Sequence, residues 1–119
     1  MKIIVAEDEP ITLATLELRL KRDGHEVVTA NDGTKALQQL LDHSPDLVIT
    51  DIMMPYNSGL EILCAVKKMN KAIPVIVLST MGQENVVIEA FNLGADDYMT
   101  KPFSPNELAI RVKRFAVLA

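Results

Sequence analysis

Short apolar runs alternate along the chain with segments in which apolar residues recur at every third or fourth position. The runs are rich in valine and isoleucine and are bounded by turn residues, which is typical of buried strands, whereas the second pattern is typical of amphipathic helices. We expect five strands, at residues 2–6, 25–30, 46–50, 73–78 and 96–99. A helical segment follows each of them.

The predicted helices have recognisable ends. Pro10 suits the first turn of the first helix, and Gly24 follows its end. Ser58 and Glu61 have the spacing of a capping box, and Pro105 follows a serine at the start of the last helix. The first helix has Leu13, Leu16 and Leu20 at helical spacing, and Ala36, Leu37, Leu40 and Leu41 mark one face of the second. The inner faces of the third and last helices are expected to use Ile62, Leu63, Val66 and Met69, and Leu108, Val112 and Phe115. The fourth helix is expected around Val86, Val87, Ala90 and Phe91.

Strands that alternate with helices predict a parallel sheet covered on both faces. The crossovers between parallel strands are right-handed, so few topologies remain. We expect one α/β domain over residues 1–119, with an open, doubly wound sheet of the flavodoxin type in the strand order 2-1-3-4-5. The absence of a polar ending after the last helix favours a chain cut before a C-terminal effector domain.

Composition narrows the classes of protein. The single cysteine, Cys64, cannot form an internal disulfide, which fits a reducing compartment. No apolar run approaches the ~20 residues of a membrane helix, so we expect a cytoplasmic protein without membrane contact. The net charge of −4 gives no support to direct nucleic-acid binding. We interpret the basic cluster Arg111, Lys113 and Arg114 as a solvated helix face.

Polar side chains follow four of the five predicted strands. The carboxyl ends of these strands share one edge of the sheet, where such folds bind ligands. Carboxylates that crowd there repel one another unless a cation joins them, and Mg²⁺ prefers such oxygen ligands. A hydroxyl and an ammonium beside them suit a phosphoryl group. The residues are Glu7, Asp8 and Glu9 after the first strand, Asp51 after the third, Ser79 and Thr80 after the fourth, and Lys101 after the fifth.

Each of these residues also has a simpler interpretation. Asp51 could cap the following turn, and an acidic run could favour a helix N-terminus electrostatically. Lys101 could be an ordinary surface lysine. The residues alone therefore leave both interpretations open, and their convergence at one sheet edge favours the phosphoryl site.

The chain resembles a known family throughout its length. Five motifs carry the likeness, and together they are similar to the receiver domain of two-component response regulators, including the chemotaxis regulators. The motifs are Val5-Ala6-Glu7-Asp8-Glu9-Pro10, Asp51-Ile52-Met53-Met54-Pro55 with Gly59, the segment 74–79, Gly94-Ala95-Asp96-Asp97-Tyr98, and Lys101-Pro102-Phe103.

The resemblance implies a role for each site residue. Asp51 would accept a phosphoryl group from a histidine kinase or a phosphotransfer protein. Mg²⁺ would be held by Asp51, by Asp8 directly, by Glu7 through water, and by the main-chain carbonyl of Met53. Lys101 would clamp one phosphoryl oxygen. Ser79 would donate its hydroxyl to another, while Tyr98 turns inward.

The resemblance also implies an output surface, formed by the fourth helix, the fifth strand and the fifth helix, for an effector domain or for self-association. Asp96, Asp97, Glu107, Arg111 and Arg114 could supply part of the charged ladder that some relatives use there. However, residues 72–100 contain no lysine or arginine. One apolar position among Val86, Val87 and Ile88 is expected to be exposed.

Departures from the family pattern support an alternative. Glu7 and Ser79 replace the commoner aspartate and threonine, and Thr80 stands where alanine is frequent. Thr80 and the missing basic residues support a degenerate receiver that acts as a constitutive interaction module. If phosphorylation occurs, apolar Met53 and Met81 beside the site predict slow dephosphorylation, over minutes or longer. Another flavodoxin-like enzyme ranks far lower, because no glycine-rich loop follows the first strand.

Overall fold

The computed structural model describes residues 1–54, 56, 58–80 and 82–118. It confirms the predicted alternation of strands and helices. The elements are β1 (Lys2–Ala6), α1 (Pro10–Arg22), β2 (Glu26–Ala30), α2 (Gly33–Asp42), β3 (Leu47–Asp51), α3 (Gly59–Met69), β4 (Val75–Thr80), α4 (Glu84–Asn92), β5 (Asp97–Lys101) and α5 (Pro105–Leu118).

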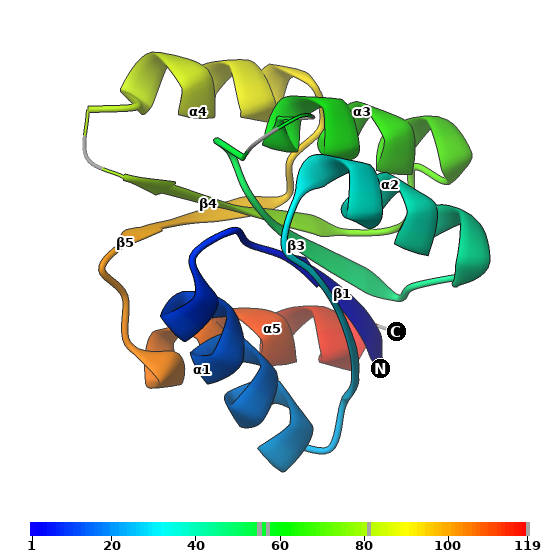
Figure 1. Cartoon of the computed structure of the whole chain (residues 1–119), viewed down its shortest axis with the longest axis vertical. Coiled ribbons are helices and arrows are strands. Elements are labelled where there is room, and N and C mark those ends of the chain that lie inside the picture. Colours follow the sequence, from blue (N-terminus) through cyan, green and yellow to red (C-terminus); the bar gives the residue numbers. More distant parts are fainter. Residues whose placement is uncertain (55, 57, 81, 119) are drawn as a thin grey trace.

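The five strands form one parallel sheet in the order β2-β1-β3-β4-β5, which confirms the predicted topology. Helices α2, α3 and α4 cover one face of the sheet, and α1 and α5 cover the other (Figure 1). The strand order reverses between β1 and β3, so the crossovers diverge on either side of this pair. The carboxyl ends of β1 and β3 therefore border the crevice in which such sheets bind ligands.

Two apolar cores lie on the two faces of the sheet. Alternate residues of one strand point to opposite faces. Ile4 and Ala6 of β1 accordingly pack under α2 and α3, whereas Ile3 and Val5 pack against α1 and α5. Since both faces are covered, every one of these four strand residues is buried.

Three apolar residues of the predicted helices are exposed, which corrects the faces expected to include Leu41 and Met69. The exposed fractions are 85% for Leu41, 47% for Met69 and 42% for Phe91. Leu41 and Met69 lie in the last turns of α2 and α3, where they border a groove between the two helices rather than the sheet. Ile88 is the expected exposed apolar residue of α4.

The strand ends also differ from the prediction, in a way that matters for the site. β4 begins at Val75 rather than residue 73, which fits the missing N–H of Pro74, and it continues to Thr80. β3 ends at Asp51 and β5 ends at Lys101. Asp51, Thr80 and Lys101 therefore lie within the sheet and not in the loops that follow the strands.

Candidate functional site

Three carboxylates meet where β1 and β3 end. Glu7 and Asp8 follow β1 and Asp51 is the last residue of β3, and one oxygen from each lies within 4.8 Å of the others. Glu7 is fully buried and Asp51 nearly so, whereas Asp8 is exposed. Glu9, the third acid of the run, instead caps α1, because its carboxylate accepts the backbone N–H groups of residues 11 and 12.

The ammonium of Lys101 joins two of these acids. Its Nζ donates to Oδ2 of Asp51 over 2.5 Å and lies 2.7 Å from Oε2 of Glu7. Burial alone would lower the pKa of Lys101, but its hydrogen bond to Asp51, its close contact with Glu7 and the charges of both acids outweigh this effect and raise the pKa. Lys101 therefore carries a positive charge at neutral pH.

Negative charge still exceeds positive charge in the cluster. Burial, reinforced by the charge of Asp51, raises the pKa of Glu7 from 4.5 to about 7, although Lys101 acts in the opposite direction. Among the described residues, no donor is aligned for a hydrogen bond to the buried Oε2 of Glu7, and the short Lys101 contact pairs it by charge only. Three carboxylates that share one ammonium fit a divalent cation that prefers oxygen ligands, such as Mg²⁺.

A glycine brings the start of α3 against the end of β3. A Cβ atom at Gly59 would lie 2.1 Å from the carbonyl oxygen of Asp51 and 2.7 Å from Cα of Ile52. The N–H of Gly59 donates to the carbonyl of Ile52 over 2.9 Å, and the N–H of Met53 donates to Oδ1 of Asp51 over 3.2 Å. Only glycine allows this approach. The motif contained Gly59, but its spacing did not reveal the contact.

The two predicted switch residues, Ser79 and Tyr98, line the same cavity. Ser79 is buried, and Tyr98 is 41% exposed and points its ring against Phe91, with centroids 5.7 Å apart in an edge-on arrangement. Both line a cavity of about 410 Å³ between β4, β5 and α4, together with Thr80 and Gln83. Tyr98 is thus turned outward in this unphosphorylated chain, whereas the resemblance implies an inward position only once Ser79 has moved towards a phosphoryl group. Of the two residues predicted to border the phosphoryl group, Met53 is exposed and Met81 lies outside the described residues. Pro55 of the family motif also lies outside them.

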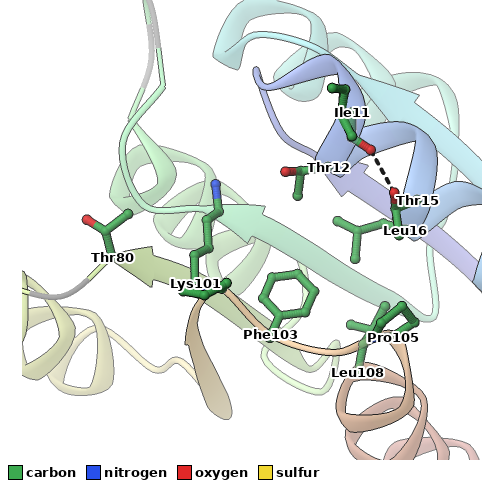
Figure 2. A pocket seen from close by; sticks show the side chains of 10 residues that line it. Ile11, Thr12, Thr15, Leu16, Thr80, Lys101, Phe103, Pro105 and Leu108 are labelled. Carbon is green, nitrogen blue, oxygen red and sulfur yellow. Dashed lines mark hydrogen bonds between the residues drawn. The ribbon is translucent and has the colours of Figure 1, made fainter.

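Lys101 also lines a mostly apolar cavity of about 470 Å³ between the start of α1 and the β5–α5 loop (Figure 2). Thr12 of α1 and Thr80 of β4 contribute polar side chains to it, and Phe103 contributes an apolar wall. Thr80 therefore borders both cavities.

The basic cluster of α5 is not simply a solvated face. Arg111 donates to Asp97 over 2.8 Å, and Arg114 lies 3.2 Å from the same carboxylate. Lys113 and Arg114 are exposed, as the prediction of a solvated face requires, whereas Arg111 is half-buried. Asp96, another candidate for an intermolecular ladder, is bound within the chain by Lys67 over 2.8 Å. Most of the expected ladder is thus engaged internally.

Among the described residues, no helix is both long and apolar enough to cross a membrane.

Comparisons with known proteins agree with the fold and the motifs. The family described as response regulator receiver domain matches residues 3–113. The alkaline phosphatase synthesis transcriptional regulatory protein PhoP of Bacillus subtilis (strain 168) is 39% identical over 112 residues, which cover 94% of this chain and 47% of the relative. The chain thus spans about half the length of this curated relative.

Solved structures give the same result. The receiver domain of NtrX from Brucella abortus has a TM-score of 0.91 and 31% identity, with 98% of this chain and 99% of that chain covered. A putative response regulator from Chloroflexus aurantiacus J-10-fl has a TM-score of 0.88 and 34% identity, with 96% and 95% covered. The sheet topology, the strand-end motifs and these similarities lead to one conclusion: this chain belongs to the response regulator receiver domain family.

Proposed function

We propose that the chain is a phosphoacceptor, which takes a phosphoryl group onto Asp51 from a histidine kinase or a phosphotransfer protein in the cytoplasm. The observation that carries the proposal is the contact of Lys101 with Asp51 and Glu7 inside a cluster of three carboxylates. A lysine that only neutralised one aspartate would not need the two additional acids.

The transfer step follows from the position of Asp51. A carboxylate oxygen of Asp51 forms a bond to phosphorus while the bond from phosphorus to the donor nitrogen breaks, and the released histidine nitrogen takes up a proton. Lys101 is near enough to Asp51 to hold one transferring oxygen, and Ser79 would donate to another. The product is an acyl phosphate. The chain would assist its own phosphorylation and slow dephosphorylation, rather than act as an enzyme on other molecules.

Mg²⁺ fits the remaining oxygens of the site. Asp8 and Asp51 would bind it directly, the main-chain carbonyl of Met53 would add a ligand, and buried Glu7 would bind through a water molecule. Bound there, the ion supplies charge that offsets the negative charge of the transferring phosphoryl group.

Phosphorylation would act on the face built from α4, β5 and α5. The added charge would draw the Ser79 hydroxyl towards Asp51, and Tyr98 would move into the space between β4 and α4. An effector domain or a second copy of the chain would read this change. PhoP is described as a transcriptional regulatory protein, so an effector that binds DNA is one candidate output, whereas this domain itself would not bind nucleic acid.

Labelling with acetyl phosphate tests the proposal. We expect intact-mass spectrometry to show one added phosphoryl group in the presence of Mg²⁺ and none after chelation. The Asp51→Asn variant should stay unlabelled, while Asp42→Asn, which changes an exposed aspartate at the end of α2, should label normally. A folded wild-type chain that is never labelled, and whose spectra do not change when beryllofluoride is added, would instead support the degenerate receiver.

A further inference from the structure

Helix α4 contacts both switch residues or their immediate neighbours. At its start, the side-chain oxygen of Gln83 accepts the backbone N–H of Thr80 over 2.7 Å, next to Ser79. Two turns later, Phe91 meets the ring of Tyr98 edge-on. All five residues line one cavity. The two contacts therefore tie the end of β4 and the middle of β5 to the same helix.

The side chain of Gln83 does not cap the helix that begins beside it. Gln83 occupies the N-cap position of α4, yet in the described structure its side chain makes no capping hydrogen bond to the helix. The side chain instead turns back to the strand that carries Ser79. Any movement of Ser79 towards Asp51 that displaces the Thr80 amide must first break this bond.

Phe91 forms the second contact, with the ring of Tyr98. It is 42% exposed, so part of the residue stays open to solvent beside Tyr98. Its ring packs edge-on against the ring of Tyr98, and both residues line the cavity between β4, β5 and α4. Edge-on aromatic pairs are favourable beyond the area they bury.

We propose that α4 latches the switch in its resting state, with Gln83 holding Thr80 and Phe91 holding Tyr98 outward. Gln83 and Phe91 are positioning residues for the phosphorylation of Asp51, and this inference rests on the proposed function. A ligand or modification favours the state to which it binds better, so weakening the resting state increases the response to phosphorylation. Loss of either contact therefore makes the active arrangement more accessible.

The first test measures phosphorylation rates. Gln83→Ala and Phe91→Leu should each raise the rate constant for labelling by acetyl phosphate by roughly two- to tenfold, as expected for one hydrogen bond or one aromatic pair. Gln83→Glu keeps an acceptor oxygen and should restore the wild-type rate. Asn85→Ala, an exposed position on the same helix, should leave the rate unchanged.

The second test needs no phosphorylation. The chain has two tyrosines and no tryptophan, so Tyr56→Phe makes Tyr98 the only strong fluorophore. In that background, Gln83→Ala and Phe91→Leu should reduce quenching of Tyr98 by acrylamide, because the released ring moves inward. A contact without a latch function would leave quenching unchanged for Gln83→Ala and increase it for Phe91→Leu.

The two tests separate this proposal from the phosphoacceptor itself. Absence of labelling in the wild type would refute the proposed function. The acrylamide quenching of Tyr98 would still test the latch, because that measurement needs no phosphorylation. Unchanged or increased quenching, or variant rates equal to those of Asn85→Ala, would overturn the latch even if Asp51 is phosphorylated.

Discussion

Lys101 provides one positive charge to two buried or nearly buried carboxylates, and this imbalance governs the electrostatics of the site. A cation in this place competes with a metal ion for the same oxygens. It also supplies charge for an incoming phosphoryl group. Removing the lysine should therefore separate metal binding from phosphorylation.

We expect Lys101→Ala to bind Mg²⁺ roughly tenfold more tightly than the wild type, because a nearby positive charge is lost. The same variant should be labelled by acetyl phosphate at least about tenfold more slowly, since one charge that holds the phosphoryl oxygens is gone. Calorimetric titration and intact-mass kinetics measure the two effects. Lys68→Ala, an exposed lysine of α3, is the control. Weaker Mg²⁺ binding by Lys101→Ala would contradict the competition.

The raised pKa of Glu7 predicts a pH-dependent metal site. With a pKa of about 7, Glu7 keeps its proton in slightly acidic solution, and Mg²⁺ binding must release it. Apparent Mg²⁺ affinity should therefore increase roughly tenfold between about pH 6 and pH 8. Titrations at several pH values check this, and Glu7→Gln should flatten the dependence. A steep dependence that persists in Glu7→Gln would assign the proton to another group.

The same shift has a consequence for stability in the absence of metal. Between its ordinary pKa of 4.5 and its folded value of about 7, Glu7 is more protonated in the folded chain than in the unfolded chain. The free energy of unfolding should consequently decrease as the pH rises through this window, and this contribution should level off above pH 7.

At the scale of elements, the close approach of α3 to β3 is the feature that aims Asp51. In Gly59→Ala the added Cβ would lie only 2.1 Å from the Asp51 carbonyl oxygen and would force the two backbones apart. We therefore expect a loss of about 1–3 kcal/mol in the free energy of unfolding and slower labelling of Asp51. Urea denaturation and acetyl phosphate kinetics measure the two effects.

Gly24→Ala is the matched control for that prediction. Gly24 has a φ of +94°, and a Cβ atom added there would meet nothing within 4 Å, so the substitution strains the backbone far from the site. It should cost a similar ~1–2 kcal/mol but leave the labelling rate intact. Equal labelling rates in the two variants would show that Gly59 serves stability alone.

At the scale of the whole molecule, the carboxylates of the proposed metal site come together only after β1 and β3 have paired. A cation that binds the folded chain alone stabilises it by about 1.4 kcal/mol at ten times its dissociation constant. We expect Mg²⁺ to raise the melting temperature by a few degrees, about 3–6 °C. Asp8→Asn should lose this increase, because the substitution removes a proposed Mg²⁺ ligand. Since Asp8 is exposed, the same substitution leaves the core unchanged.

Asp42→Asn and K⁺ at matched ionic strength are the controls for this melting experiment. The Asp42 variant should retain the full Mg²⁺ effect, and K⁺ should produce none of it. An identical Mg²⁺ effect in Asp8→Asn would place the cation elsewhere.

Local pattern was sufficient for the architecture and for the identity of the central residues. Apolar runs such as that around Val48 and helical spacing such as Leu16 to Leu20 depend only on the repeat of the backbone, which is 2 residues in a strand and about 3.6 in a helix. The alternation of these elements, with right-handed crossovers, left few possible strand orders, and the predicted one is observed. The strand-end acids and Lys101 then followed from topology, because parallel strands end at the same edge.

Only the tertiary structure decided which side chains meet within that frame. It assigned Glu9 to a helix cap and Glu7 to the site, tied Arg111 to Asp97, and exposed Leu41. The contacts of Gln83 and Phe91 likewise had no signal in the sequence. Such pairings depend on distances of a few ångströms between elements that are separate in the chain, and periodicity carries no information about those distances.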